Sequence, residues 1–72
     1  MDARALIGEI IKRNTAAYPD DIRLSDLENW DSLKGVRLII RIEEAIGRQL
    51  LEDEIAGLQS IRDVAQFLQR GV

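Results

Sequence analysis

The sequence predicts an all-α fold, a small four-helix bundle with three main helices, one short helix and a long first loop. Three segments carry apolar residues at the three- and four-residue spacing typical of a helix with one buried face. Between the first two segments, Pro19 and its acidic neighbours interrupt that spacing and indicate a loop. No stretch alternates apolar and polar residues as a half-buried strand does, so no sheet is predicted.

The first helix is predicted over residues 3–14. Asp2 precedes it, and aspartate commonly caps helix starts. The apolar residues of its buried face are Leu6, Ile7, Ile10 and Ile11. The loop over residues 14–31 is expected to be pinned to the core by isolated apolar residues, namely Ile22, Leu24 and Leu27. A single helical turn is also expected in this loop, because Ser25 and Glu28 have the spacing of a capping box.

The second helix is predicted to begin at Asp31 or Ser32 and to end at Gly47, because glycine readily adopts the left-handed conformation that ends many helices. Counted at about 100° per residue, one arc of this helix gathers the residues expected to face the core. They are Gly35, Leu38, Ile39, Ile42, Ala45 and Ile46.

The C-terminal third holds two further helical segments. A short turn is expected between Leu51 and Leu58. Ser60 and Asp63 again have the spacing of a cap, and a last helix follows to about Gln69. Its buried face is predicted to contain Ile61, Val64, Ala65, Phe67 and Leu68.

The second helix carries more apolar surface than one buried stripe requires. Leu33, Val36 and Ile40 lie outside the core arc, and they either pack under the first loop or stay exposed for a partner. A basic strip lies on the side of the helix opposite the core, with Glu43 on one flank and Glu44 on the other. It is either a solvated face or a contact surface. It comprises Lys34, Arg37, Arg41 and Arg48.

Composition excludes most enzyme chemistry. The 72 residues, expected to form one domain over 1–72, contain neither cysteine nor histidine, which removes thiol nucleophiles, imidazole bases and the usual zinc ligands. The net charge of -3 disfavours non-specific binding to nucleic acid. No apolar run is long enough for a membrane helix, and the first residues lack the pattern of a secretory signal, so we expect a cytoplasmic protein.

A set of marks in a helical frame resembles a known family. Asp31-Ser32-Leu33 opens the second helix, and the later marks are Val36, Leu38, Glu43-Glu44, Gly47, the acidic turn "EDEI" and Ser60. Residues 30–68, and with the first helix almost the whole chain, are in this way similar to the carrier proteins. These are the acyl and peptidyl carriers of fatty acid, polyketide and nonribosomal peptide synthesis.

The resemblance implies a carrier and not an enzyme. Ser32 matches the serine to which a separate phosphopantetheinyl transferase attaches 4'-phosphopantetheine from coenzyme A, and Asp31 matches the residue that helps the transferase recognise the site. The thiol of the arm would hold an acyl, aminoacyl or peptidyl group as a thioester. The further partners implied are a loading ligase or acyltransferase and downstream synthase enzymes. A monomeric carrier would contact these enzymes through Leu33, Val36 and Ile40.

Two features depart from carriers of fatty acid synthesis, many of which display acids on the second helix. Lys34, Arg37 and Arg41 are basic here, so we expect partners with an acidic or apolar docking face. Trp30 stands where a smaller residue is common, and it either staples the loop to the helix or gives a flat contact to partner or cargo. Both departures favour a specialised pathway, such as polyketide, nonribosomal peptide or modified lipid synthesis.

Two alternatives from other classes remain at the level of sequence. An unmodified helical adaptor would use Leu33, Val36 and Ile40 as a groove for a partner helix. A small nucleic-acid binder would present Arg37, Arg41 and Arg48, but it would lack an aromatic platform for stacking bases. On the residue pattern alone, Asp31 and Ser32 could also serve simply as a helix cap.

Overall fold

The computed structural model describes residues 2–70 and confirms an all-α architecture in that range. Its helices are α1 (Ala3–Ile11), α2 (Ser32–Ile46), α3 (Glu52–Ala56) and α4 (Ile61–Arg70), with a 3-10 turn, η1 (Leu24–Asp26), inside the long first loop. None of the helices in this range is long and apolar enough to cross a membrane.

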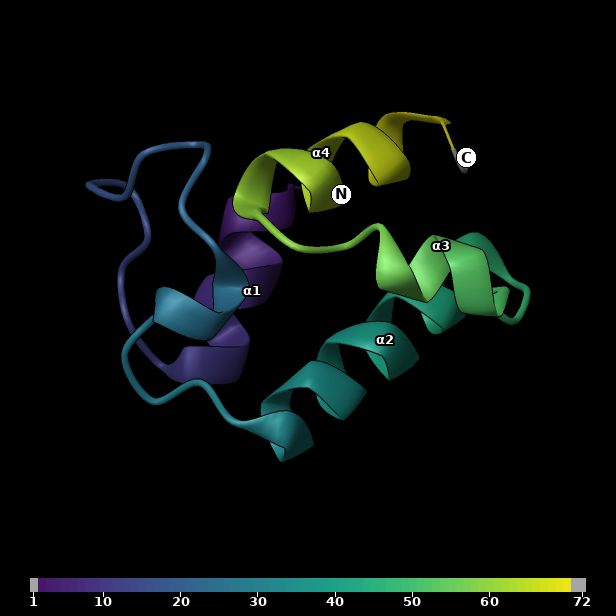
Figure 1. The fold of residues 1–72 in the computed structure, drawn as a ribbon, viewed down its shortest axis with the longest axis horizontal. Helices are drawn as coiled ribbons and strands as arrows, with labels where there is room; N and C mark the ends of the chain where they lie inside the picture. Colours follow the sequence, from purple (N-terminus) through teal and green to yellow (C-terminus); the bar gives the residue numbers. More distant parts are fainter. Residues whose placement is uncertain (1, 71–72) are drawn as a thin grey trace.

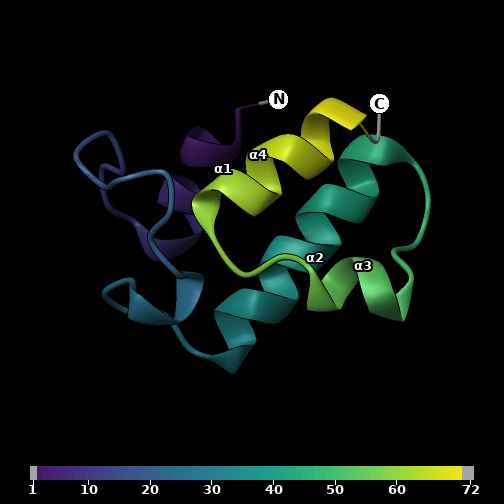
Figure 2. The ribbon, with the colours of Figure 1, turned by 45° about the horizontal axis from the view of Figure 1, so that its top comes forward.

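The core lies among α1, α2 and α4. α1 packs against both α2 and α4, whereas α3 lies at the side of the molecule away from the first loop (Figures 1 and 2). The largest fully buried side chains all come from the three longer helices, and they are Ile7, Ile11, Leu38, Ile42, Ile61 and Val64. No residue of α3 is buried, so this short helix rests on the edge of the core.

The predicted caps of α1 and α4 are confirmed. The Asp2 carboxylate accepts a hydrogen bond from the backbone N–H of Arg4 at 3.0 Å. At α4, the N–H of Asp63 donates to Ser60 Oγ and the N–H of Ser60 donates to Asp63 Oδ2, both at 3.1 Å. This reciprocal pair is a capping box, which satisfies backbone donors that a helix start leaves free.

The predicted end of the first helix at residue 14 is wrong, because α1 ends at Ile11. Lys12 adopts a left-handed conformation with φ of 59°, and its N–H donates to the Gly8 carbonyl. The chain folds back so closely that a Cβ at Gly8 would lie 2.8 Å from the Arg13 carbonyl oxygen. α1 therefore ends at the last apolar residue of its predicted face, where the left-handed Lys12 turns the backbone back toward Gly8.

The long first loop is tied down near its start and in its middle. The Thr15 hydroxyl, which is buried, donates to the Arg4 carbonyl at 2.8 Å. Farther along, the N–H of Leu24 donates to the Gln59 carbonyl at 2.9 Å, and the N–H of Arg62 donates to the Asp20 carbonyl at 2.8 Å. The loop thus pairs with the segment that leads into α4, as Figure 1 shows.

The predicted turn within this loop is present as η1, but its predicted capping box is wrong. η1 follows Arg23 and has no side-chain cap, so Ser25 and Glu28 do not form the expected reciprocal bonds. Instead, a Glu28 carboxylate oxygen lies 3.2 Å from Nε of Arg13. The spacing was right for a box, but a tertiary ion pair with the end of α1 engages the glutamate.

The core face predicted for α2 is largely confirmed. Leu38 and Ile42 are buried, and three further members of the arc are half-buried, namely Gly35, Ile39 and Ile46. Ala45 is exposed, so its predicted burial is wrong. It stands at the edge of the arc next to the basic strip, where the helix surface turns from the core toward solvent.

Candidate functional site

The start of α2 assigns the helix cap to Asp31 and leaves the Ser32 side chain free. Asp31 has extended backbone angles, and its Oδ1 accepts a hydrogen bond from the N–H of Lys34 at 2.9 Å. Ser32 is the first helical residue and is exposed. Among residues 2–70 its hydroxyl has no hydrogen-bond partner, so it is free and accessible to solvent.

The electrostatics of this helix start favour negative charge. The backbone N–H of Lys34 lowers the pKa of the Asp31 carboxyl below its ordinary value, and the Lys34 ammonium, 3.7 Å from Oδ2, lowers it further. The first turn of α2 contains no acidic residue. Free backbone N–H groups and the positive end of the helix dipole therefore face the region of Ser32.

An exposed apolar patch lies on α2 beside Ser32. The exposed fractions of Leu33, Val36 and Ile40 are 58%, 51% and 49%, so the first loop does not cover them. Large apolar side chains that stay this exposed on one helix face are typical of a contact surface. The structure thus brings together the three apolar residues that the sequence placed on this face.

Trp30 packs against the core from the loop that precedes α2. It is half-buried, and a Cβ at Gly35 would lie 4.0 Å from its Cζ2 atom. The indole therefore staples the loop to the second turn of α2, which is one of the two roles expected for it. It also lines an open cleft of about 420 Å³, so part of the ring remains accessible.

That cleft lies next to α2 and is partly closed by α3. Gly35, Leu38 and Ile39 line it from α2, and Ile55 and Leu58 line it from α3 and the residues after it. Ile55 and Leu58 were not predicted as site residues. The sequence did offer one signal, a pair of apolar residues in a segment too short for a core helix. Only the fold shows that these two residues face α2 across the cleft.

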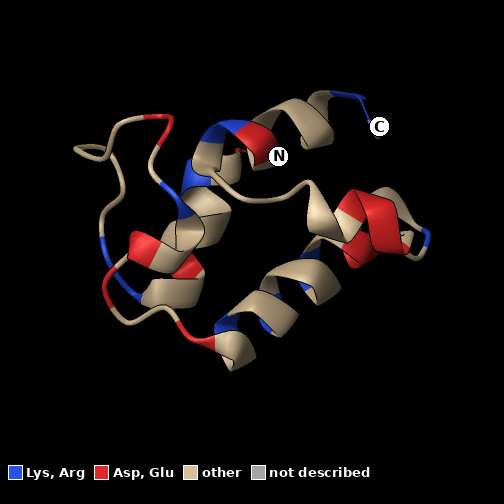
Figure 3. Cartoon of the chain, viewed as in Figure 1, with Lys and Arg blue, Asp and Glu red and all other residues tan. Residues whose placement is uncertain are grey.

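Figure 3 shows basic positions along α2, and ion pairs divide the predicted strip. Arg41 Nη2 lies 2.8 Å from a Glu9 carboxylate oxygen on α1, and Arg48 makes two hydrogen bonds to Glu54, at 2.8 and 2.9 Å. Arg48 leaves the strip because the left-handed turn at Gly47 redirects the chain toward α3. Among residues 2–70, Arg37 has no carboxylate oxygen within 4.0 Å.

Comparison with known proteins gives a consistent result. A family model described as "Phosphopantetheine attachment site" matches residues 2–68. The meromycolate extension acyl carrier proteins of Mycobacterium tuberculosis (strain H37Rv) and Mycobacterium leprae are each 30% identical over 69 residues, covering 89% of this chain and 59% of the relative. An acyl carrier protein of Rhodococcus erythropolis is 24% identical over 70 residues, covering 92% of this chain and 77% of the relative. The chain therefore spans about 59% of the length of the mycobacterial relatives.

Proposed function

This chain belongs to the phosphopantetheine attachment-site family, and on that basis we propose that Ser32 bears the 4'-phosphopantetheine arm and that Asp31 helps the transferase recognise it. Members of this family are carriers and not catalysts. The prosthetic group, when bound, supplies a terminal thiol that holds the cargo as a thioester. The observation that carries the proposal is that Ser32, the first residue of α2, is exposed and that its hydroxyl makes no hydrogen bond within residues 2–70.

The residues at the start of α2 fit a phosphodiester on Ser32. Its hydroxyl is accessible, and the adjacent helix end offers free N–H donors and a favourable dipole for an anion. Asp31 already has its Oδ1 engaged by the Lys34 N–H, and its second oxygen faces the Lys34 ammonium at 3.7 Å. This pairing limits the repulsion between the Asp31 carboxylate and a phosphate on its neighbour.

The proposed cargo is an acyl, aminoacyl or peptidyl group in a specialised biosynthetic pathway. The basic character of α2 supports this choice, because a docking surface built for an acidic helix would repel it. The name of the mycobacterial relatives, meromycolate extension acyl carrier protein, supports an acyl cargo and a lipid pathway among the proposed alternatives. We place the protein in the cytoplasm as a monomer.

The proposed partners are the phosphopantetheinyl transferase, a loading ligase or acyltransferase, and downstream synthase enzymes. All of them must reach Ser32, so they cover the start of α2 and the exposed apolar patch that follows it. The residues proposed to contact them are Trp30, Leu33, Val36, Arg37, Ile40 and Arg41. Exposed apolar side chains next to arginine are suited to a protein contact.

The first prediction concerns the attachment itself. Incubation with coenzyme A, magnesium and a broad-specificity phosphopantetheinyl transferase is expected to raise the intact mass by about 340 Da, since the added group is a phosphopantetheinyl unit. Ser32→Ala should abolish the gain, whereas Ser25→Ala, which removes another exposed serine, should leave it unchanged. Mass spectrometry of the intact chains measures both results.

A chain that stays unmodified under these conditions would contradict the proposal. If such a chain still bound a partner, and Ile40→Asp but not Ser32→Ala abolished that binding, the adaptor function would be favoured instead. The apolar patch would then be a groove for a partner helix.

A further inference from the structure

A basic groove runs between α1 and α2. It consists of two adjoining depressions of about 470 and 190 Å³, which share Ile10 and Arg37. Ile10 and Ile11 form the apolar part of the larger depression. Four cationic side chains also line it, namely Lys12, Arg13, Lys34 and Arg37. The groove thus joins the end of α1 to the half of α2 that begins with Ser32, although only its α2 side was visible in the sequence pattern.

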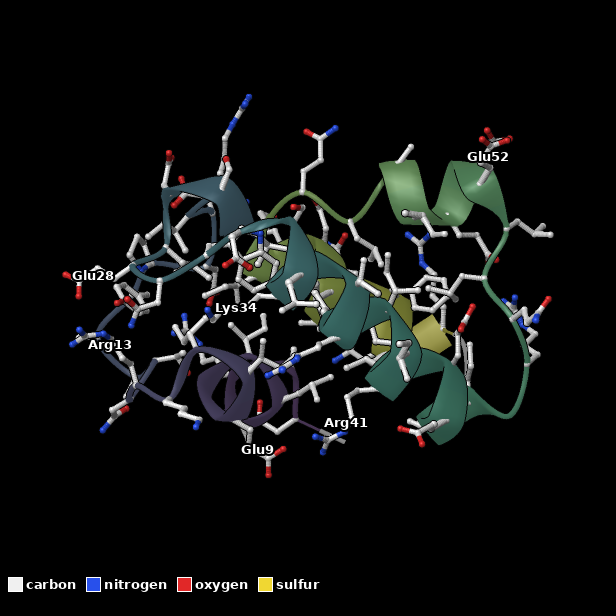
Figure 4. The ribbon with its side chains drawn as sticks, turned by 90° about the horizontal axis from the view of Figure 1, so that it is seen from below. Glu9, Arg13, Glu28, Lys34, Arg41 and Glu52 are labelled. Atoms are coloured by element: carbon white, nitrogen blue, oxygen red, sulfur yellow. The ribbon has the colours of Figure 1, made fainter. Side chains whose placement is uncertain are left out.

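The ion pairs around the groove leave an excess of positive charge. Figure 4 shows Arg13 beside Glu28 and Arg41 beside Glu9, and these pairs have atomic separations of 3.2 and 2.8 Å. Lys34 is paired with the cap of α2. Among residues 2–70, Lys12 and Arg37 have no carboxylate oxygen within 4.0 Å.

Arg37 occupies the centre of this arrangement. It lines both depressions, and the smaller one also contains Ile40, a member of the exposed apolar patch. A carboxylate placed over the groove would gain charge-assisted hydrogen bonds from the guanidinium, which presents paired donors suited to a carboxylate. An apolar side chain of the partner next to that carboxylate would contact the exposed apolar patch. One partner surface can therefore bind both Arg37 and the patch.

The net charge of the chain favours a protein, and not a lipid surface or a nucleic acid, as the partner that binds in the groove. The chain carries a net charge of -3, which disfavours approach to a uniformly anionic lipid surface or nucleic acid. A local carboxylate on a protein needs only a local excess of positive charge, and the groove supplies it.

We infer that the α1–α2 groove, with Arg37 as its anchor and Lys12 beside it, receives an acidic side chain of the enzymes that act at Ser32. The inference rests on the proposed function, because it assumes that such enzymes cover the start of α2. It changes the role expected for Arg41, since the ion pair to Glu9 neutralises that arginine. It also adds the end of α1 to the docking surface.

The test uses the phosphopantetheinyl transferase of the organism that encodes this chain, with coenzyme A, at low salt. Arg37→Glu is expected to raise KM about tenfold and leave kcat nearly unchanged, because the substitution weakens association with the transferase and does not affect the chemical step. Its control is Arg62→Glu, which makes the same charge change at an exposed residue of α4 and should leave KM unchanged. High salt should remove most of the difference.

A second variant should act in the opposite direction. Glu9→Gln frees Arg41 and is expected to lower KM about twofold to threefold. Its control is Glu52→Gln, at the start of α3, which lies at the top of the view in Figure 4 whereas Glu9 lies at the bottom. Far-UV circular dichroism of each variant checks that the helices are intact.

Equal KM values for Arg37→Glu and Arg62→Glu, with complete modification of Ser32 at saturating transferase, would overturn this inference and leave the proposed function standing. Absence of modification in every chain would overturn both. Binding of the wild type to phosphatidylserine vesicles that Arg37→Glu abolishes, with unchanged transferase kinetics, would assign the groove to a membrane and also overturn the inference.

Discussion

Neighbouring residues at the start of α2 have separate tasks. Asp31 satisfies a backbone donor of the first turn through the bond from the Lys34 N–H, whereas the hydroxyl of Ser32 takes no part in the cap. A serine that capped the helix would have its oxygen engaged by backbone N–H groups. The division of tasks keeps that oxygen free while the helix start remains stable.

Substitution of Asp31 separates its structural role from its proposed recognition role. Asp31→Asn should change the free energy of unfolding by only a few tenths of a kcal/mol, because asparagine is an equally good N-cap, while Asp31→Ala should cost about 1 kcal/mol. Both variants should lower the kcat/KM of the transferase about tenfold if it uses the charge of the carboxylate. Urea denaturation and the rate of mass gain measure the two effects, and a full rate for Asp31→Asn would restrict Asp31 to capping.

At the scale of elements, α3 combines a partly buried Ile55, packed against the core, with a set of polar contacts. It contributes no buried residue, and Glu54 accepts two hydrogen bonds from Arg48 and one from the N–H of Leu51 at 2.8 Å. These bonds, the one from Arg48 first, lower the pKa of Glu54 to about 2. Ile55 of α3 and Leu58 after it line the cleft beside α2.

The pair between Arg48 and Glu54 predicts a pH dependence for α3. The folded pKa of Glu54, about 2, lies below its ordinary value of 4.5, so the unfolded state binds more protons between these values. The stabilisation is therefore complete above pH 4.5 and is lost as the pH falls toward 2.

Hydrogen exchange of the α3 amides, compared between the wild type and Glu54→Gln, measures this contribution. The wild type should be better protected at neutral pH, and the difference should shrink as the pH is lowered below 4.5. Glu44→Gln, at an exposed residue of α2, is the control and should match the wild type. A difference that stays constant over this range would show that Glu54 does not stabilise α3 through its charge.

At the scale of the whole molecule, the core is small and comes mainly from three helices, with Leu24, Leu27 and Leu50 added from the connections between them. A chain of this length buries only about 60% of the surface it exposes when unfolded, and its six largest fully buried side chains are aliphatic. Each of them therefore accounts for a large share of a stability that is typically about 5–15 kcal/mol. The exposed apolar patch adds little to that stability, which leaves it available for contacts.

Two isoleucines of α2 separate these roles. Ile42 is fully buried, with 0% of its surface exposed, and Ile42→Ala should lower the free energy of unfolding by about 2–5 kcal/mol because it leaves a cavity. Ile40 is 49% exposed, and Ile40→Ala should change that free energy by less than about 0.5 kcal/mol. Urea denaturation measures both values, and a loss at Ile40 as large as at Ile42 would place the patch in the core.

The sequence by itself determined the helices, most of the core face of α2, the caps of α1 and α4, and the family resemblance that singled out Ser32. These features depend on residues a few positions apart, whose spacing a helix converts directly into faces and ends. Only the tertiary structure decided that α1 stops at Ile11, that Glu9 neutralises Arg41, and that Arg48 turns to Glu54. The pair between Glu9 and Arg41 depends on where two distant helices meet, and the other two features depend on how the chain turns just beyond a helix end. The periodicity of a single helix carries no information about either.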